Sequence, residues 1–304
     1  MLNVMRRMLP GALQKWLLKG WLRLERHLPM PARSLFWNDF SLFGKPRLGY
    51  LEAHLVDHCN LNCRGCSHFA PLAKPFFVAP DDFERDMRRL SVLFGNIRVI
   101  RLMGGEPLLH PEVDRFLSIA RAAFPVARIH LVTNGLLLAD PRESFWLACR
   151  QNRVIVDVTV YPPVQIRLER IRALCHSQGV SLRESPNSAF CARMNFKGDS
   201  PLRASFSHCR NLFFCPVLKA GKLYVCAPSA YVGLFNARYG THVPEGPGIA
   251  LDDPANTGRT ILRALNRPVE MCRFCSLETV MVPWSSGGGE MADWDVRGVP
   301  RRHK

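Results

Sequence analysis

Between Tyr50 and Val180 the chain alternates between short apolar runs and longer segments whose apolar residues recur at helical spacing. The short runs are rich in Val, Ile and Leu, as strands buried on both faces are, and each is followed by enough residues for a crossover helix. The predicted strands are Leu51–Val56, Ile97–Met103, Ile129–Thr133, Val154–Val160 and Val180–Arg183. The predicted helices are Pro80–Phe94, Pro111–Phe124, Pro141–Arg150 and Val164–Ser177. This order predicts an α/β fold with parallel strands, in which ligands bind at the carboxyl ends of the strands.

Changes of composition divide the chain into four segments. We expect an N-terminal basic amphipathic helical segment at residues 1–47, a core α/β domain at 48–200, a cysteine-bearing module at 201–290 and a basic tail at 291–304. The boundary near residue 200 is predicted from the irregular, Asn-, Ser-, Gly- and Pro-containing sequence that precedes a group of cysteines.

The N-terminal segment combines apolar and basic residues within positions 10–28. Its apolar residues are Leu13, Trp16, Leu17, Leu24 and Leu28, and its basic residues include Lys15, Lys19, Arg23 and Arg26. Such a helix can lie on an anionic membrane surface, bind a partner, or dock on its own domain with a solvated basic face. No run reaches the roughly 18 uncharged residues that cross a bilayer, and no small-residue cleavage site follows. We therefore expect a cytoplasmic protein.

The composition, with 47% hydrophobic and 22% charged residues, is that of a globular protein. The net charge of +16 favours an acidic substrate or partner through electrostatic steering, although a solvated surface also explains it. Part of this charge lies in the tail, at Arg297, Arg301, Arg302 and Lys304. No basic motif with interleaved aromatic residues points to nucleic acid, and DNA binding is not expected. Eleven cysteines are too many for an inert protein of a reducing compartment and too dilute for a disulfide scaffold, so metal binding is the first interpretation.

The first cysteine group is Cys59, Cys63 and Cys66, spaced C-x3-C-x2-C directly after the first predicted strand. Structural zinc requires four protein ligands, whereas an iron–sulfur cubane held by three thiolates keeps one iron open for another ligand. Zinc with a distant fourth ligand is the alternative. The spacing favours an iron–sulfur cluster that takes part in chemistry.

The Cys59–Cys66 motif resembles the signature of the radical S-adenosylmethionine (SAM) superfamily. The resemblance implies a partial βα barrel of six units, a 4Fe-4S cluster on the three cysteines and SAM on its open iron. It also implies reductive cleavage of SAM to a 5′-deoxyadenosyl radical that removes hydrogen from a substrate. Gly104, Gly105 and Glu106, in GGEP after the second strand, resemble the motif that contacts the methionine amine, and Glu106 could pair with that amine directly.

Two further positions bear on SAM binding. Asn134 follows the third strand in Thr-Asn-Gly and, by the resemblance, lies near SAM or the substrate; an Asn-Gly turn is the alternative. The family often has an aromatic residue before the third cysteine, where this chain has Gly65. The adenine contact then comes from elsewhere, with His68 or Phe69 as candidates, although Phe69 could equally be a packing residue.

The second cysteine group comprises Cys209, Cys215, Cys226, Cys272 and Cys275. Gly221 and Cys226 form G-x4-C in a hairpin-like segment that resembles the start of the twitch and SPASM modules of this superfamily. The resemblance implies a second 4Fe-4S cluster held by four of the five cysteines, with Cys209 and Cys215 as alternatives for the first ligand. A zinc site is the other interpretation. Cys149 and Cys175 lie in helical runs and are expected to be buried, and Cys191 is expected to pack.

The resemblance implies hydrogen abstraction from a small polar metabolite, such as a sugar, an amino acid or a phosphorylated compound, in a bacterial biosynthetic pathway. With the second cluster as an electron relay the result is a net oxidation. Return of hydrogen, for which Cys191 and Tyr161 are conceivable donors, would instead give epimerisation. The electron donor is expected to be a flavodoxin or ferredoxin. The alternatives are peptide modification, RNA modification, transfer of the 3-amino-3-carboxypropyl group of SAM, and a non-catalytic iron–sulfur or zinc interaction protein.

Overall fold

The computed structural model describes residues 44–139, 142–212 and 214–298 of the chain. The predicted basic helix at residues 10–28 and the tail residues Arg301, Arg302 and Lys304 lie outside this range. No helix of the described part has the length and apolar character needed to cross a bilayer.

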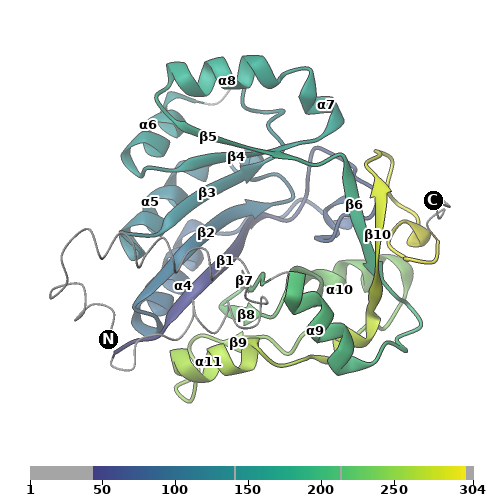
Figure 1. Ribbon diagram of the computed structural model, residues 1–304. Helices are drawn as coiled ribbons and strands as arrows, with labels where there is room; N and C mark the ends of the chain where they lie inside the picture. The colour runs from purple at the N-terminus through teal and green to yellow at the C-terminus, as the bar shows by residue number, and fades with distance from the viewer. Residues whose placement is uncertain (1–43, 140–141, 213, 299–304) are drawn as a thin grey trace, which may run out of the picture.

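An eight-stranded sheet organises the described chain (Figure 1). Its strands follow the order β5-β4-β3-β2-β1-β7-β8-β9. Strands β1 to β5 and β7 are parallel, whereas β8 and β9 run antiparallel to their neighbours. The bounds are β1 Arg47–Val56, β2 Asn96–Gly104, β3 Arg128–Thr133, β4 Ile155–Val160, β5 Ser181–Pro186, β7 Val217–Lys219, β8 Lys222–Tyr224 and β9 Ile249–Ala250. The five strands predicted from hydrophobic runs are therefore confirmed, with ends that differ by a few residues.

The helices between these strands also lie where the hydrophobic spacing predicts them. They are α4 Pro80–Leu93, α5 Val113–Ala123, α6 Glu143–Gln151, α7 Pro162–Gln165 and α8 Leu168–Ser177. The single helix predicted over residues 164–177 is two helices, α7 and α8, separated at Ile166 and Arg167. Helix α7 begins at Pro162, whose fixed φ suits the first helical position.

The main core lies between the helices and one face of the sheet. Residues of β1 to β4 alternate, so that every second side chain faces the helices, as the two-residue period of a strand requires. On this face the strands contribute Leu51, Ala53, Leu55, Ile100, Leu102, Ile129, Leu131, Val156 and Val158, and the helices contribute Phe83, Met87, Leu90, Phe116, Leu117, Phe145 and Trp146. The intervening strand residues face the other side of the sheet.

The sheet departs from the predicted six-unit barrel after β5. The next strand, β6 (Ala189–Met194), leaves the sheet and pairs with β10 (Cys275–Pro283) as an antiparallel ribbon. The sixth parallel strand is β7, which adds to the β1 edge instead of following β5. A short β7–β8 hairpin then continues the sheet, with Ala220 and Gly221 in the left-handed conformation at its turn. The segment predicted as a separate module thus extends the main sheet.

The remaining C-terminal elements surround a second core. They are α9 Leu202–Leu212, α10 Ala227–Tyr239, α11 Gly258–Leu265 and the short helices η3 Glu270–Phe274 and η4 Met291–Asp293. The second core combines residues of α10 with Phe69, Met271 and Trp294. Because Phe69 follows the first cysteine group in the sequence, the C-terminal part of the chain is packed onto that cysteine loop.

Replacing Leu102 with alanine tests the main core. Leu102 is fully buried in β2 near the centre of the sheet. We expect Leu102→Ala to lower the free energy of unfolding by about 2 to 5 kcal/mol, because a cavity remains where the side chain was. Val126→Ala removes a side chain that is 77% exposed and should change stability by less than about 0.5 kcal/mol. Equal midpoints of urea unfolding for the two variants would contradict the described core.

Candidate functional site

The first cysteine group lies on the loop that leaves the carboxyl end of β1. N–H groups of the protein are directed at the sulfurs of this loop. The backbone N–H of Leu61 donates to Cys59 Sγ at 3.3 Å, and the indole Nε1 of Trp284 donates to Cys63 Sγ at 3.2 Å. Cys66 accepts hydrogen bonds from the backbone of the three residues 68–70. Donors of this kind are what the cysteine ligands of an iron–sulfur cluster accept.

Burial raises the pKa of Cys59 to about 12 and that of Cys63 to about 11, and it also raises the pKa of Cys66. Iron would bind these groups as thiolates and displace their protons. The described residues contain no group of three His, Cys, Asp or Glu side chains placed around one metal ion. Cubane cysteines bind separate irons of one cluster. The three thiols and their N–H donors fit such a cluster.

Gly104 and Gly105 bring the end of β2 against the backbone of the cysteine loop. A Cβ atom on Gly104, whose φ is +154°, would lie 2.1 Å from the carbonyl oxygen of Val56, and one on Gly105 would lie 2.0 Å from that of His58. The N–H of Gly105 donates to Val56 O at 2.8 Å, and that of Glu106 donates to His58 O at 3.1 Å. The close backbone approach that requires glycine here is therefore made to the start of the cysteine loop.

Glu106 joins the ends of β2 and β3. Its side chain is fully buried, and its Oε1 accepts from Thr133 Oγ1 at 2.7 Å and from the backbone N–H of Leu108 at 3.0 Å. Its Oε2 accepts from the backbone N–H of Asn134 at 2.8 Å. Burial raises the pKa of Glu106 to about 7, although these hydrogen bonds act in the opposite direction. The carboxylate therefore serves first as a connection between two strand ends.

Asn134 connects the end of β3 to the cysteine loop. Its Nδ2 donates to Asn60 Oδ1 at 2.6 Å and to Cys59 Sγ at 3.7 Å. Its Oδ1 accepts from the backbone N–H of Leu136, and Gly135 adopts a φ of +78°. The turn interpretation of Thr-Asn-Gly is confirmed, and Asn134 also contacts the cysteine loop.

The structure gives Phe69 a packing role and explains the glycine at position 65. Phe69 is fully buried, and its ring centroid lies 5.7 Å from that of Phe235 and 6.0 Å from that of Trp294. Its predicted contact with SAM is therefore not supported. Gly65 has a φ of +66°, and a Cβ there would lie 2.9 Å from the carbonyl oxygen of Asp293. A larger residue at position 65 would displace the C-terminal segment.

Helix α9 carries Cys209 and is hydrogen-bonded to the segments of Cys226 and Cys275. Ser205 lies one turn before Cys209 on this helix, and its hydroxyl donates to the carbonyl of Cys275 at 3.0 Å. Arg210 is buried, and its guanidinium donates to the carbonyl of Val225, next to Cys226, at 3.3 Å.

The pKa shifts in this group have a common cause. Burial raises the pKa of Cys209, of Cys272 (to about 11) and of Cys275, and the charges of neighbouring cysteines raise them further. Cys226 acts on all three. Cys226 and Cys209 also raise the pKa of Cys215, so the five cysteines form one electrostatically coupled group.

Cys215 is the cysteine of this group that lies next to β1. Burial raises the pKa of Cys215, and the charges of Glu52, Cys226 and Cys209 raise it further. The backbone N–H of Glu52 donates to the carbonyl of Pro216 at 2.9 Å. The electrostatic contacts therefore do not separate Cys209 from Cys215 as the first ligand.

The remaining cysteines differ from one another. Cys149 and Cys175 are each 1% exposed in the main core, as predicted. Cys191 is half-buried on β6, and its thiol adds to the raised pKa of Cys209. It also lines a cavity of about 370 Å³ together with Gly65 and Ser67 of the first cysteine loop. Cys191 is therefore a cavity residue, which differs from the expected packing role.

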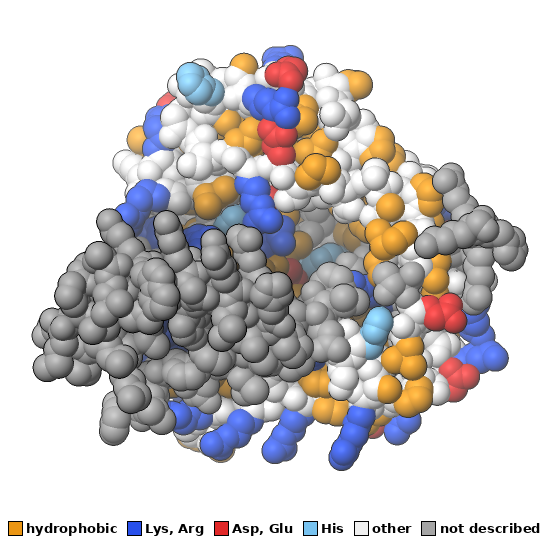
Figure 2. All heavy atoms as spheres, viewed as in Figure 1, with side chains coloured by type: hydrophobic (Ala, Val, Ile, Leu, Met, Phe, Trp, Pro, Cys, Tyr) orange, Lys and Arg blue, Asp and Glu red, His pale blue; other side chains and the backbone are white. Residues whose placement is uncertain are grey.

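The sheet face opposite the helices carries a row of polar side chains. We call this row the polar face, and it consists of Tyr50, Glu52, Arg101, His130, Asp157, Arg183 and Ser185, from β1 to β5. The strands place them in register, since Arg101 pairs with both Glu52 and His130, and Asp157 pairs with Arg183. Figure 2 shows that the molecule is hollowed on this side and that basic, acidic and histidine side chains occupy the hollow.

Asp157 is the centre of the polar face. It is fully buried and contacts His130 Nδ1 at 3.2 Å, Ser185 Oγ at 2.8 Å and Arg101 Nη2 at 3.5 Å. Burial alone would raise the pKa of Asp157, but the hydrogen bonds from His130 and Ser185, together with the charges of Arg101 and Arg183, outweigh it and lower the pKa. The buried Nε of Arg101 has no hydrogen-bond partner in the described structure. The face therefore retains a donor for a polar ligand.

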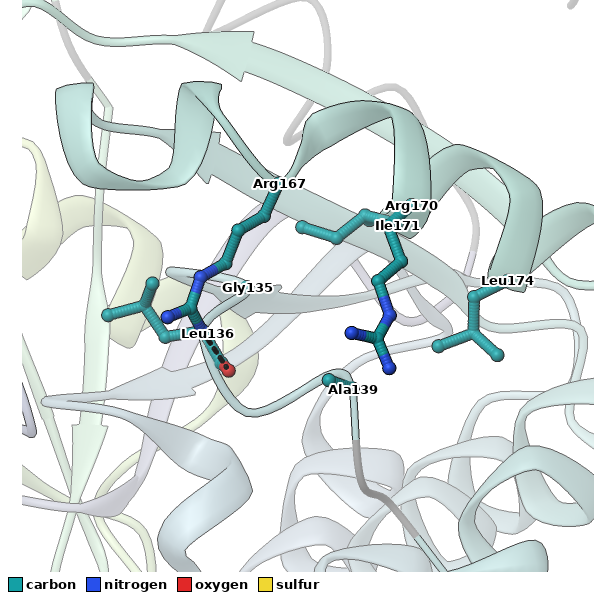
Figure 3. Close-up of a pocket in the computed structure, with 7 residues that line it drawn as sticks. All are labelled: Gly135, Leu136, Ala139, Arg167, Arg170, Ile171 and Leu174. Atoms are coloured by element: carbon teal, nitrogen blue, oxygen red, sulfur yellow. Dashed lines mark hydrogen bonds between the residues drawn. The ribbon is translucent and has the colours of Figure 1, made fainter.

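A further cavity, of about 290 Å³, lies between α8 and the loop after Asn134 (Figure 3). Arg167 and Arg170 extend toward this loop, and Arg167 Nη1 donates to Leu136 O at 3.5 Å. Among the described residues, the lining consists of these two arginines and small or aliphatic side chains.

Replacing Gly105 with alanine tests the contact between β2 and the cysteine loop. The added Cβ would meet the carbonyl of His58, so that the loop must move. We expect Gly105→Ala to lower the thermal unfolding midpoint and to remove about four irons from the reconstituted protein, as loss of one cubane does. Gly289→Ala, which meets no heavy atom within 4 Å, is the control. Normal iron binding by Gly105→Ala would contradict the proposed contact.

The pH dependence of stability tests the burial of Glu106. Its pKa rises from 4.5 to about 7 on folding, so the folded chain holds the proton more tightly and stability falls as pH rises through this interval. We expect the iron-free protein to lose on the order of 2 to 3 kcal/mol from about pH 4.5 to about pH 8 relative to Glu106→Gln. The exposed Glu112→Gln should retain the wild-type slope. A wild-type slope in Glu106→Gln, measured by urea unfolding, would refute this assignment.

Comparison with known proteins agrees with the first cysteine site. Residues 54–181 match the family described as the Radical SAM superfamily. Two relatives are named GTP 3′,8-cyclase: that of Microcystis aeruginosa is 34% identical over 109 residues, and that of Geobacter sulfurreducens is 36% identical over 101 residues. These alignments cover 34% and 32% of this chain and 32% and 30% of those proteins. The chain thus spans about a third of the length of the curated relatives it matches.

Two solved structures align with parts of the chain at low similarity. The crystal structure of BtrN in complex with AdoMet and 2-DOIA has a TM-score of 0.46 and 16% identity, covering 77% of this chain and 97% of that chain. The structure of anSMEcpe with bound AdoMet has a TM-score of 0.38 and 20% identity, covering 46% and 43%. TM-scores below 0.5 are too low to transfer a substrate or a residue role. The sequence match therefore covers residues 54–181, which are similar to the radical SAM superfamily and include the first cysteine group.

Proposed function

We propose that the chain cleaves SAM reductively and removes a hydrogen atom from a small polar metabolite. The observation that carries the proposal is the position of Cys59, Cys63 and Cys66 at the carboxyl end of β1, inside the matched domain. When bound there, a 4Fe-4S cluster would supply the electron and an iron that is open to SAM. The chain holds this loop in place through the backbone contacts of Gly105 and the side chain of Asn134.

The polar face supports a small polar substrate. Its side chains offer cations, carboxylates and hydroxyl groups in one row that is largely buried at Glu52, His130 and Asp157, where polar groups left without partners are costly. A ligand with several hydroxyl or charged groups would satisfy donors such as Arg101 Nε. Because relatives that match part of the chain are named GTP 3′,8-cyclase, GTP is one compound to test, alongside sugars, amino acids and other phosphorylated metabolites. An acidic substrate would also be favoured by the net charge of +16.

A second 4Fe-4S cluster is proposed on Cys209, Cys226, Cys272 and Cys275. The support is their electrostatic coupling and the hydrogen bonds through Ser205 and Arg210 that join their segments. Arg193 and Arg210 also act to lower the pKa of Cys209, which favours a thiolate ligand. We propose that this cluster exchanges electrons with the reaction, and that a flavodoxin or ferredoxin reduces the enzyme.

The nucleoside product tests the proposed reaction. We expect the anaerobically reconstituted protein, with SAM and a strong reductant, to form 5′-deoxyadenosine, identified by mass spectrometry. The variant with Cys59→Ala, Cys63→Ala and Cys66→Ala should form none. Methylthioadenosine would instead indicate transfer of the aminocarboxypropyl group. No cleavage by cluster-loaded protein would refute the proposal in favour of a non-catalytic metal protein.

Metal analysis tests the second cluster. We expect about eight irons per chain in the reconstituted protein and about four after Cys272→Ala and Cys275→Ala, because each cubane contains four. Cys215→Ala should retain about eight, since the hydrogen bonds of α9 connect the helix of Cys209, rather than Cys215, to the segments of Cys226 and Cys275. Zinc in place of the second set of irons, or loss of iron from Cys215→Ala alone, would contradict the proposed ligands.

A further inference from the structure

The C-terminal segment 284–296 pairs with the first cysteine loop. The backbone N–H of Arg64 donates to Ser285 O at 3.0 Å, and the N–H groups of Gly287 and Gly288 donate to Asn62 O at 2.9 and 3.1 Å. A side-chain bond adds to these contacts, since Arg64 Nε lies 2.9 Å from Asp293 Oδ1. Residues more than 200 positions apart in the sequence therefore form one structural unit around the cysteines.

Within this segment, Trp284 reaches a cysteine sulfur directly. Its Nε1 donates to Cys63 Sγ at 3.2 Å, and Cys63 is only 6% exposed, so water does not replace this donor freely. Trp294, by contrast, donates its Nε1 to the backbone carbonyl of Cys66 at 2.8 Å. The two indoles thus differ in the atom they bind, although both contact the same loop.

Neighbouring residues fix the position of the Trp284 ring. Its backbone N–H donates to Ser188 O at 2.8 Å, and its ring stacks on that of Tyr161, with centroids 5.9 Å apart and planes at 28°. Tyr161 follows β4, so the indole is held between the C-terminal segment and the carboxyl end of the sheet. An N–H donor that is held in this way forms the same bond in both oxidation states of a bound cluster.

We propose that Trp284 sets the reduction potential of the first cluster by donating its indole N–H to the sulfur of Cys63. This inference rests on the proposed function only in requiring a cluster on Cys59, Cys63 and Cys66. A hydrogen bond to a ligating sulfur withdraws negative charge from it, and reduction adds one negative charge to the cluster. The bond therefore stabilises the reduced state and raises the potential. Trp284 is a positioning residue, since it acts through Cys63.

The test compares Trp284→Phe with Trp294→Phe in the reconstituted full chain. The midpoint potential of the first cluster is followed by redox titration with electron paramagnetic resonance, using the signal that is absent from the Cys59, Cys63 and Cys66 triple variant. We expect Trp284→Phe to shift the midpoint to a lower potential while iron content stays at the wild-type value. Trp294→Phe, which loses a bond to a carbonyl oxygen, should keep the wild-type potential. An unchanged midpoint in Trp284→Phe overturns the proposal.

A second substitution covers the case in which Trp284→Phe fails to retain the cluster. Benzothienylalanine at position 284 preserves the size of the ring and its stacking on Tyr161, while sulfur replaces the N–H group. The same downward shift is expected, and a wild-type midpoint overturns the proposal. A shifted potential in a protein that forms no 5′-deoxyadenosine would preserve this inference and refute the proposed function. Equal iron content in wild type and the triple variant would refute both.

Discussion

The buried carboxylate of Glu106 is the interaction on which the candidate site depends most. It joins the ends of β2 and β3 through hydrogen bonds from Thr133 and from the backbone of Asn134. Asn134 in turn contacts Cys59, and the backbone beside Glu106 bonds to the start of the cysteine loop. The Glu106 side chain thus connects the ends of β2 and β3, and the Glu106 backbone and Asn134 connect them to the loop after β1. A buried carboxylate is tolerated here because its protein donors replace water.

The C-terminal part of the chain completes this site. Strand β10 begins at Cys275, a candidate ligand of the second cluster, and is followed directly by Trp284, which donates to Cys63. The second core is built partly on Phe69, next to the first cysteine loop. One continuous strand therefore connects the two cysteine groups. Loss of packing around one cysteine group should therefore also displace the other group, because β10 and the residue that follows it contact both.

The strands of the sheet and the helices between them were predictable from the sequence. Short Val-, Ile- and Leu-rich runs such as Leu51–Val56, separated by segments of helix length, are typical of buried parallel strands. The first cysteine group was predictable because its residue types lie within one short segment. The pairing of Gly287 with Asn62 was not, since it joins distant segments through backbone groups that every residue carries. The path of β6 and the grouping of the second set of cysteines likewise depend on tertiary packing, which leaves no local pattern in the sequence.

The polar face could not be predicted from the sequence, because its residues are spread singly over five strands and only the strand register brings them together.

The central claim concerns the cysteines at the end of β1. Its most direct test is pulsed electron paramagnetic resonance of the reduced, reconstituted protein with SAM that carries an isotopically labelled methionine amine. The account predicts a hyperfine coupling between the cluster and the labelled amine that disappears in Cys63→Ala. A cluster signal that SAM leaves unchanged would contradict it.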